Sequence, residues 1–172
     1  RAFVFVLFRF MGLLCALPTI LILYILKPIV WLKLGRLHAD RLGHLAVNTD
    51  IFLRRLQLGI YSDEPFYCFF CSPKGLANRQ VLTMFKRVLN IYESRILTLI
   101  FNGMLPLLKR TPFHQPLGLD CSEYYEFNYA KSSLSFTSEE IEKGRKILSQ
   151  MNVDLDQDEF VCIFARDNAY LQ

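Results

Sequence analysis

The 172-residue sequence predicts an α/β fold in which a largely parallel sheet domain follows a hydrophobic, membrane-associated helix. Two observations predict this fold class. Short apolar strands alternate with amphipathic helical segments in residues 37–119, which is the pattern of βαβ units. Ahead of them, residues 10–26 contain no charged side chain, although 21% of the whole chain is charged.

The uncharged segment is the candidate membrane anchor. Its 17 residues fall just short of the roughly 20 that span a bilayer core. Apolar residues on both sides extend it, because Arg9 and Lys27 can place their charges among head groups. Pro18 and Pro28 allow a kinked or re-entrant path. No small-residue cleavage site follows, so we expect a retained anchor rather than a signal peptide, with a buried core helix as the alternative.

Charge is distributed unevenly along the chain. Residues 1–119 hold 15 of the 20 basic and 5 of the 16 acidic side chains, whereas residues 120–172 are acidic. Four cations follow the anchor: Lys27, Lys33, Arg36 and Arg41. Such a basic collar is typical of the cytoplasmic side of a membrane segment. We therefore assign residues 1–36 to anchor and collar, and expect the positive charge to serve lipid head groups rather than nucleic acid.

The first α/β unit begins in GRLHAD (35–40), which predicts a short strand at about 37–40. The loop DRLGH (40–44) follows this strand, and a helix comes next. We expect the helix to end near Gly59, because glycine suits the position just after a helix.

Two further elements follow in the same part of the chain. EPFYCFFCSP (64–73) is an apolar run that predicts a buried strand. NRQVLTMFKRVLN (78–90) predicts an amphipathic helix with Asn78 as its N-cap. The apolar face of that helix contains Val81, Leu82, Phe85, Val88 and Leu89. Residues 95–110 are too apolar to assign by periodicity, so a core strand with a turn and a second membrane-touching helix both remain open.

The acidic part of the chain contains a helix and a last strand. TSEEIEKGRKILSQM (137–151) begins with a capping box between Thr137 and Glu140. Apolar residues recur in it at Ile141, Leu148 and Met151. FVCIFA (160–165) then predicts a short strand that runs directly into RDNAYLQ.

Polar residues follow the first predicted strand, at the sheet edge where open α/β folds bind ligands. Gly43 permits a positive φ or a close backbone approach, and the helix start offers unpaired N–H groups to an anion. The guanidinium of Arg41 suits a phosphate, and His44 can act as a general base. These residues, with Asn48, form the first candidate site. The alternative is that Arg41 contacts lipid and His44 braces the turn.

A second polar cluster, ARDNAY (165–170), follows the last predicted strand. Arg166 at a strand end is placed to bind a diphosphate, and Asp167 could orient that Arg or bind a hydroxyl. A local ion pair between these two residues is the alternative.

Other types of site lack their residues in this sequence. Cys68 and Cys71 form a Cys-x-x-Cys without a second pair or nearby histidines, so we expect buried thiols in a reducing compartment rather than a zinc site. The acidic turn at 154–159 lacks the glycine and distal glutamate of a calcium loop. No nucleophile elbow, P-loop or dinucleotide fingerprint appears. We therefore expect no metal site and no cofactor.

The two polar clusters, in this order, resemble a bacterial family of glycosyltransferases associated with polysaccharide biosynthesis. The pattern of that family is a hydrophobic segment, an R-[IL]-G-H-L motif, a Thr/Ser–Glu–Glu helix with G-x-x-x-L, and a strand ending in R-D-x-x-Y-L. The matching stretches here are RLGHLAVNTD (41–50), FTSEEIEKGRKIL (136–148) and FVCIFARDNAYL (160–171).

The resemblance implies a GT-B-type fold, in which two Rossmann-like domains face each other across a cleft. Residues 37–159 would form the N-terminal, acceptor-side domain, and residues 160–172 the truncated start of the donor-side domain. His44 would be the base or an acceptor contact beside Arg41, Gly43 and Asn48. Arg166 and Asp167 would hold the donor diphosphate without a metal ion.

The activity that the resemblance implies is sugar transfer from a nucleotide-sugar donor to a glycan or lipid-linked acceptor. It would take place at the inner (cytoplasmic) membrane, with the domain facing the cytoplasm, during surface-polysaccharide biosynthesis. Two alternatives remain open. One is a non-catalytic, membrane-anchored scaffold or binding module, and the other is a small integral-membrane protein with hydrophobic segments at 2–32 and 96–108.

Overall fold

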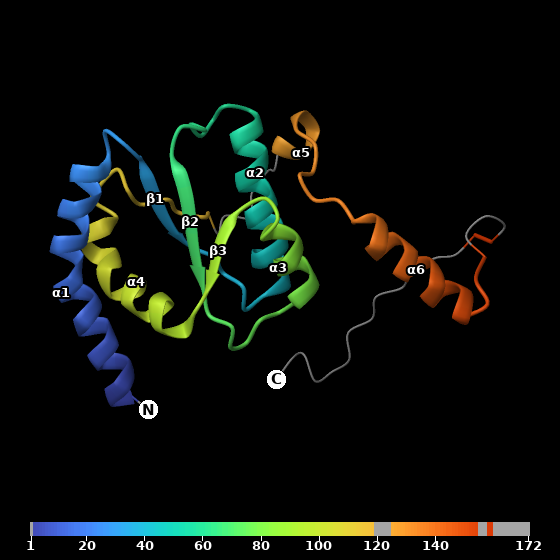
Figure 1. Ribbon diagram of the computed structural model, residues 1–172, viewed down its shortest axis with the longest axis horizontal. Coiled ribbons are helices and arrows are strands. Elements are labelled where there is room, and N and C mark those ends of the chain that lie inside the picture. Colours follow the sequence, from blue (N-terminus) through green and yellow to red (C-terminus); the bar gives the residue numbers. More distant parts are fainter. Residues whose placement is uncertain (1, 119–124, 155–157, 160–172) are drawn as a thin grey trace. The chain divides into compact units, whose positions relative to one another are not determined.

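The centre of the fold is a three-stranded parallel sheet with strands in the order β1-β2-β3 (Figure 1). The computed structural model describes residues 2–118, 125–154 and 158–159, with side chains from Phe10 onward. The strands are β1 (Leu32–Arg36), β2 (Phe66–Cys71) and β3 (Asn90–Glu93). The predicted α/β fold with a parallel sheet is therefore confirmed.

Helices cover both faces of this sheet (Figure 1). Helices α1 (Ala2–Leu26) and α4 (Arg95–Leu108) lie on one face, and α2 (Thr49–Gln57) and α3 (Arg79–Phe85) lie on the other. Side chains of β2 pack against the helices on both faces of the sheet, because successive side chains along a strand point to opposite faces. Phe69 belongs to the buried cluster under α2 and α3, whereas Phe70 packs into the cluster under α1 and α4.

After α4 the chain returns to the free edge of β1. The N–H of Leu34 donates to the carbonyl of Phe113 at 2.7 Å, and the N–H of Gln115 donates to the carbonyl of Leu34 at 2.9 Å. This parallel bridge places residues 113–115 beside β1, opposite β2. The chain thus runs outward from β1 to β2 and β3, and then returns through α4 to the opposite side of β1. Such a reversal of strand order is consistent with a Rossmann-like sheet, and it marks where such sheets bind ligands.

The first strand lies earlier than the sequence predicts. It covers Leu32–Arg36 rather than residues at about 37–40, and the chain leaves the sheet after the N–H of Leu37 bonds to Phe70. The prediction was wrong because residues 32–36, with Lys33 and Arg36, were assigned to the anchor and its basic collar. A Cβ at Gly35 would lie 2.5 Å from Cε1 of Phe69, so only glycine fits at this point of the sheet.

The other element predictions have mixed outcomes. Strand β2 is buried as predicted. The side chain of Asn78 caps α3 by accepting a hydrogen bond from the N–H of Val81 at 3.0 Å. Gly59, with φ +69°, follows the end of α2 as predicted. Residues 95–108, which periodicity left open, form helix α4. The helix predicted to continue to residue 90 ends at Phe85, and β3 follows it unpredicted.

Helix α1 is the predicted hydrophobic helix. Within the part of the chain whose side chains are described, no helix is both long enough and apolar enough to cross a membrane. Lys33 and Arg36, predicted to belong to a basic collar, are residues of β1. The side of α1 that faces α4 includes Gly12, where an added Cβ would lie 2.3 Å from the carbonyl oxygen of Ile100.

The chain divides into two units, residues 1–135 and residues 136–172. The second contains α6 (Ser138–Gln150), which begins with the predicted capping box. The N–H of Glu140 donates to the hydroxyl of Thr137 at 3.2 Å, and the N–H of Thr137 donates to the Glu140 carboxylate at 2.8 Å. Within the described part of this unit no α6 side chain is buried. The strand predicted at 160–165 lies outside the described residues.

Candidate functional site

The candidate site lies at the carboxyl end of β1, where the chain crosses from the sheet into the helix that contains α2. Residues 37–41 form this crossing, and the helix starts at Leu42. The carbonyl of Ala39 accepts from the N–H of Ala77 at 2.8 Å, which fastens the crossing to the chain just before α3. The predicted order of strand, polar loop and helix is therefore present, although the strand ends earlier.

A π-helical turn, η1 (His44–Asn48), interrupts the helix between its first residues and α2. Single π turns inside helices occur frequently at functional sites. In this turn the side-chain amide nitrogen of Asn48 lies 3.3 Å from Nδ1 of His44. Asn48 is only 6% exposed, whereas the His44 ring is half-buried. Asn48 therefore holds the His44 ring by Nδ1 and leaves Nε2 available to a ligand.

A second histidine, which the sequence prediction missed, lies beside His44. The ring centroids of His38 and His44 are 6.3 Å apart. His38 is half-buried between Leu37 and Ala39, which are both buried. The sequence marks His38 as a polar residue between the apolar Leu37 and Ala39, but it does not reveal that His38 lies beside His44.

The surroundings of His38 favour its neutral form. Burial lowers the pKa of His38 most, and the charge of Arg36 lowers it further. Asp40 raises this pKa, and His44 lowers it slightly. Near neutral pH the imidazole of His38 is therefore uncharged and can accept a proton.

Arg41 and Gly43 lie between the two histidines in the sequence. The side chain of Arg41 is exposed. A second cation near the site is Arg36, whose guanidinium donates a hydrogen bond to the side-chain oxygen of Asn102 on α4 at 3.4 Å. Gly43 has φ −60°, so it does not use the positive φ that glycine permits. Among the described residues, no atom lies within 4 Å of a Cβ built at Gly43, so there is open space beside the first turn of this helix. The first N–H groups of a helix have no partner within the helix, so a ligand in this space can approach them.

Charged residues further along α2 have partners within the fold. Nε of Arg54 donates to Asp50 at 2.7 Å, and a guanidinium nitrogen of Arg54 donates to the carbonyl of Ala130. Nε of Arg55 donates at 2.5 Å to Glu126, a fully buried residue of α5 (Glu126–Tyr129). The contacts of Arg54 with Ala130 and of Arg55 with Glu126 join α5 to α2. We therefore place the candidate site at the start of the helix and not at these two arginines.

The predicted second cluster, Arg166 and Asp167, lies outside the described residues. The structure therefore describes the first cluster alone. It brings together Arg36, His38, Asp40, His44 and Asn48, with Arg41 and Gly43 alongside.

Two of the cysteines are free thiols within the sheet, whereas Cys15 is exposed on α1. Cys68 and Cys71 are both buried in β2, as predicted. Burial raises the pKa of Cys71 to about 11, and the charge of Glu93 contributes in the same direction. Among the residues described, no group of three or more histidine, cysteine and acidic side chains could hold a metal ion.

The arrangement at the end of β1 can bind an anion and accept a proton, because it combines an open helix start, cations and two adjacent imidazoles. Comparisons of the sequence and structure with protein-family models, with curated proteins and with solved structures found no match.

Proposed function

We propose that this chain is part of a membrane-associated glycosyltransferase that transfers a sugar from a nucleotide-sugar donor in surface-polysaccharide biosynthesis. In this proposal residues 37–159 form the acceptor-side domain of a GT-B-type enzyme, and a donor-side domain begins at residue 160. The observation that carries the proposal is the pair of histidines, His38 and His44, at the carboxyl end of β1 beside an open helix start.

The chemistry of sugar transfer gives each of these residues a role. The bond from the anomeric carbon to the diphosphate oxygen breaks, and a bond from that carbon to an acceptor oxygen forms. The acceptor hydroxyl loses its proton, so a general base is required. We assign this role to Nε2 of His44 in the tautomer whose Nδ1 carries the hydrogen. In that tautomer the Asn48 side-chain amide is turned over, so that its oxygen accepts from Nδ1–H. The neutral ring of His38 contacts the same hydroxyl.

Anionic groups of the substrates would meet the positive end of the site. Arg41 and the open backbone at Gly43 would bind a phosphate of a lipid-linked acceptor or of the donor. Arg166 and Asp167 would hold the donor diphosphate, and the cation would stabilise the leaving group without a metal ion. The apolar helix α1 would keep the enzyme at the inner membrane, with the site on the cytoplasmic side.

The test is release of nucleoside diphosphate from a panel of nucleotide-sugars by the purified full-length enzyme that contains this chain, with and without a lipid extract as acceptor. We expect acceptor-dependent release that falls about 100-fold or more in His44→Asn, since loss of a general base costs this much. His114→Asn is the matched control, because His114 is the remaining histidine and packs beside Leu34 in the sheet.

Two results would overturn the assignment. Equal losses in His44→Asn and His114→Asn would mean that His44 has no special role. No release and no binding of any nucleoside diphosphate would favour the alternative, a non-catalytic scaffold or binding module.

A further inference from the structure

One narrow stripe of residues along helix α1 is buried against the rest of the domain. Gly12, Ala16 and Leu23 are buried, and Leu23 shares a buried cluster with Phe101 and Leu108 of α4. A Cβ at Gly12 would lie 2.3 Å from the carbonyl oxygen of Ile100, so the two helices touch through their backbones. Because this stripe packs against α4, α1 is a layer of the fold and not a separate anchor.

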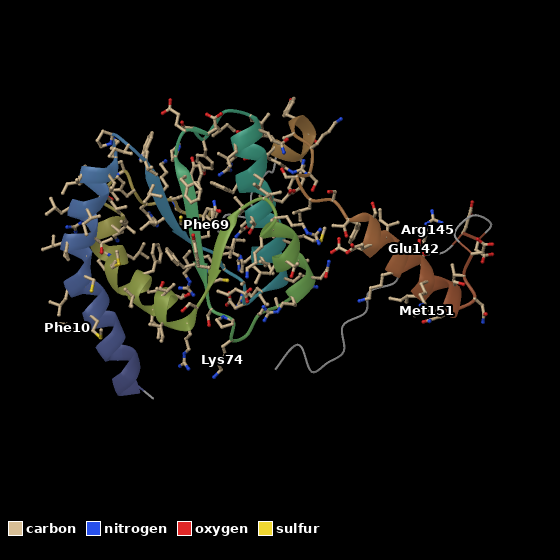
Figure 2. All side chains as sticks on the ribbon, viewed as in Figure 1. Phe10, Phe69, Lys74, Glu142, Arg145 and Met151 are labelled. Atoms are coloured by element: carbon tan, nitrogen blue, oxygen red, sulfur yellow. The ribbon has the colours of Figure 1, made fainter. Side chains whose placement is uncertain are left out.

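The rest of the described α1 surface is apolar and exposed. Its outer face consists of Phe10, Leu13, Leu14, Leu17, Leu21, Ile22 and Ile25, which are between 42% and 68% exposed. No charged residue lies between Phe10 and Leu26. Figure 2 labels Phe10 on α1 and shows side chains of this helix on its side away from α4. A helix face of this kind in water would carry polar residues, so the outer face fits an apolar partner.

Cations and a tryptophan lie where α1 ends. Nζ of Lys27 is 5.1 Å from the centre of the Trp31 ring, and Nζ of Lys33 is 5.4 Å from it. Between them Ile29 is 81% exposed. Exposed Lys109 and Arg110 follow α4 directly after Leu108, which packs with Leu23 of α1. Lysine and arginine next to exposed apolar side chains form the composition that proteins place at lipid head groups.

The apolar outer face of α1 and the cations at its end together fit one kind of partner. A second copy of this chain could cover the outer face, but it would leave the cationic end without anions. A bilayer with anionic head groups satisfies both features at once, because acyl chains cover apolar side chains and phosphates attract lysine and arginine.

We propose that the outer face of α1 lies in the plane of one leaflet of an anionic bilayer, with Lys27 and Lys109 at the head groups. The helix is held between the domain and the lipid and does not cross the membrane. This inference rests on the membrane part of the proposed function and is independent of sugar transfer.

Vesicle flotation of the full chain without any sugar donor tests the proposal. We expect binding to vesicles of phosphatidylcholine with about one-third phosphatidylglycerol, and weaker binding to phosphatidylcholine alone. Leu14→Glu with Leu21→Glu should reduce binding at least about tenfold on both kinds of vesicle. Lys27→Gln with Lys109→Gln should reduce binding roughly thirty-fold on anionic vesicles only. Thermal unfolding of each variant verifies that it is folded.

Matched controls change the same residue types elsewhere. Ile141→Glu replaces an exposed apolar residue of α6, and Lys74→Gln removes an exposed cation from the loop after β2, labelled in Figure 2. Both should bind like the wild type. Two outcomes would overturn the proposal. One is an equal loss of vesicle binding in the control variants. The other is that the wild type does not bind vesicles and instead forms a lipid-free dimer that Leu14→Glu dissociates. Resistance of the bound chain to extraction by alkaline carbonate would overturn the in-plane arrangement and favour a spanning helix.

Discussion

Asn48 lies one π-helical turn after His44, and its side-chain amide nitrogen is 3.3 Å from Nδ1 of the His44 ring. Because Asn48 is almost fully buried, it can fix the orientation of the ring that projects from the helix beside it. In the proposed enzyme this contact is the means by which the fold aims Nε2 of His44 at the acceptor.

The first prediction concerns this contact. Asn48→Ala should lower sugar transfer about fivefold, because the lost hydrogen bond contributes about 1 kcal/mol to positioning the ring. The free energy of unfolding should fall by a similar small amount, about 1 kcal/mol. Steady-state kinetics and chemical denaturation measure the two effects. Asn102→Ala is the control, since Asn102 bonds Arg36 and does not contact either histidine ring in the described structure.

The substitution Gly43→Ala should affect the stability of the fold and the binding of substrate in opposite directions. Gly43→Ala should raise the free energy of unfolding by up to about 1 kcal/mol, because its φ of −60° is helical and alanine favours helices. The same methyl group should weaken substrate binding, since it enters the open space beside the helix start. Denaturation and KM measurements check this prediction. A variant that is more stable and unchanged in KM would show that no substrate approaches Gly43.

Sequence signals that act over three or four residues predicted their elements well. The N-cap at Asn78, the capping box at Thr137 and Glu140, and the helix end at Gly59 are each set by local hydrogen bonding or by backbone conformation. Strands were harder to place. Gly35 is required by Phe69 from a neighbouring strand, and β3 begins soon after a helix without a glycine or proline between them.

The candidate site could be predicted only in part for a related reason. His44 and Arg41 follow from their place between a strand and a helix. His38 was missed because its distance to His44 depends on where β1 ends and on the π turn, and neither is a property of nearby residues. Long-range packing decides such features, so propensity and periodicity do not reveal them.

His38 should make the stability of the fold depend on pH. Burial lowers its pKa in the folded protein below the ordinary value, so the unfolded chain binds more protons in the range below about pH 6.5. The free energy of unfolding is therefore highest above this range and falls as the pH decreases toward 5. Burial lowers the pKa of His114 as well.

Denaturation curves between pH 7 and pH 5 test this expectation. His38→Asn should make the fall in stability shallower, and His38→Asn with His114→Asn should make it shallower still. The slopes are compared, not the absolute stabilities, because asparagine also changes packing. A fall as steep in the double variant as in the wild type would contradict the assignment.

The buried ion pair between Arg55 and Glu126 should control the attachment of α5 to α2. Burial alone would raise the pKa of Glu126, but its hydrogen bond and charge interaction with Arg55 hold it below the usual value. Glu126→Gln should therefore cost about 2 kcal/mol of unfolding free energy at pH 7. This contribution is present above about pH 4.5 and is lost as the pH falls further.

Acid denaturation of Glu126→Gln measures both effects. The variant should be less stable than the wild type at pH 7 and should lose less stability below pH 4.5. Glu64→Gln is the control because Glu64 is exposed in the loop before β2. Equal stability of Glu126→Gln and Glu64→Gln at pH 7 would mean that the ion pair does not stabilise the fold.

The close contact between α1 and α4 gives the last prediction. A Cβ at Gly12 would lie 2.3 Å from the carbonyl oxygen of Ile100 and 2.9 Å from Cα of Gly103, so Gly12→Ala must push the helices apart. We expect a loss of about 1–3 kcal/mol in unfolding free energy, the usual cost of overpacking. Gly43→Ala is the matched control, because its Cβ meets open space and its effect should have the opposite sign. Thermal unfolding in mild detergent measures both, and a stabilised Gly12→Ala would show that α1 does not pack on α4 in this way.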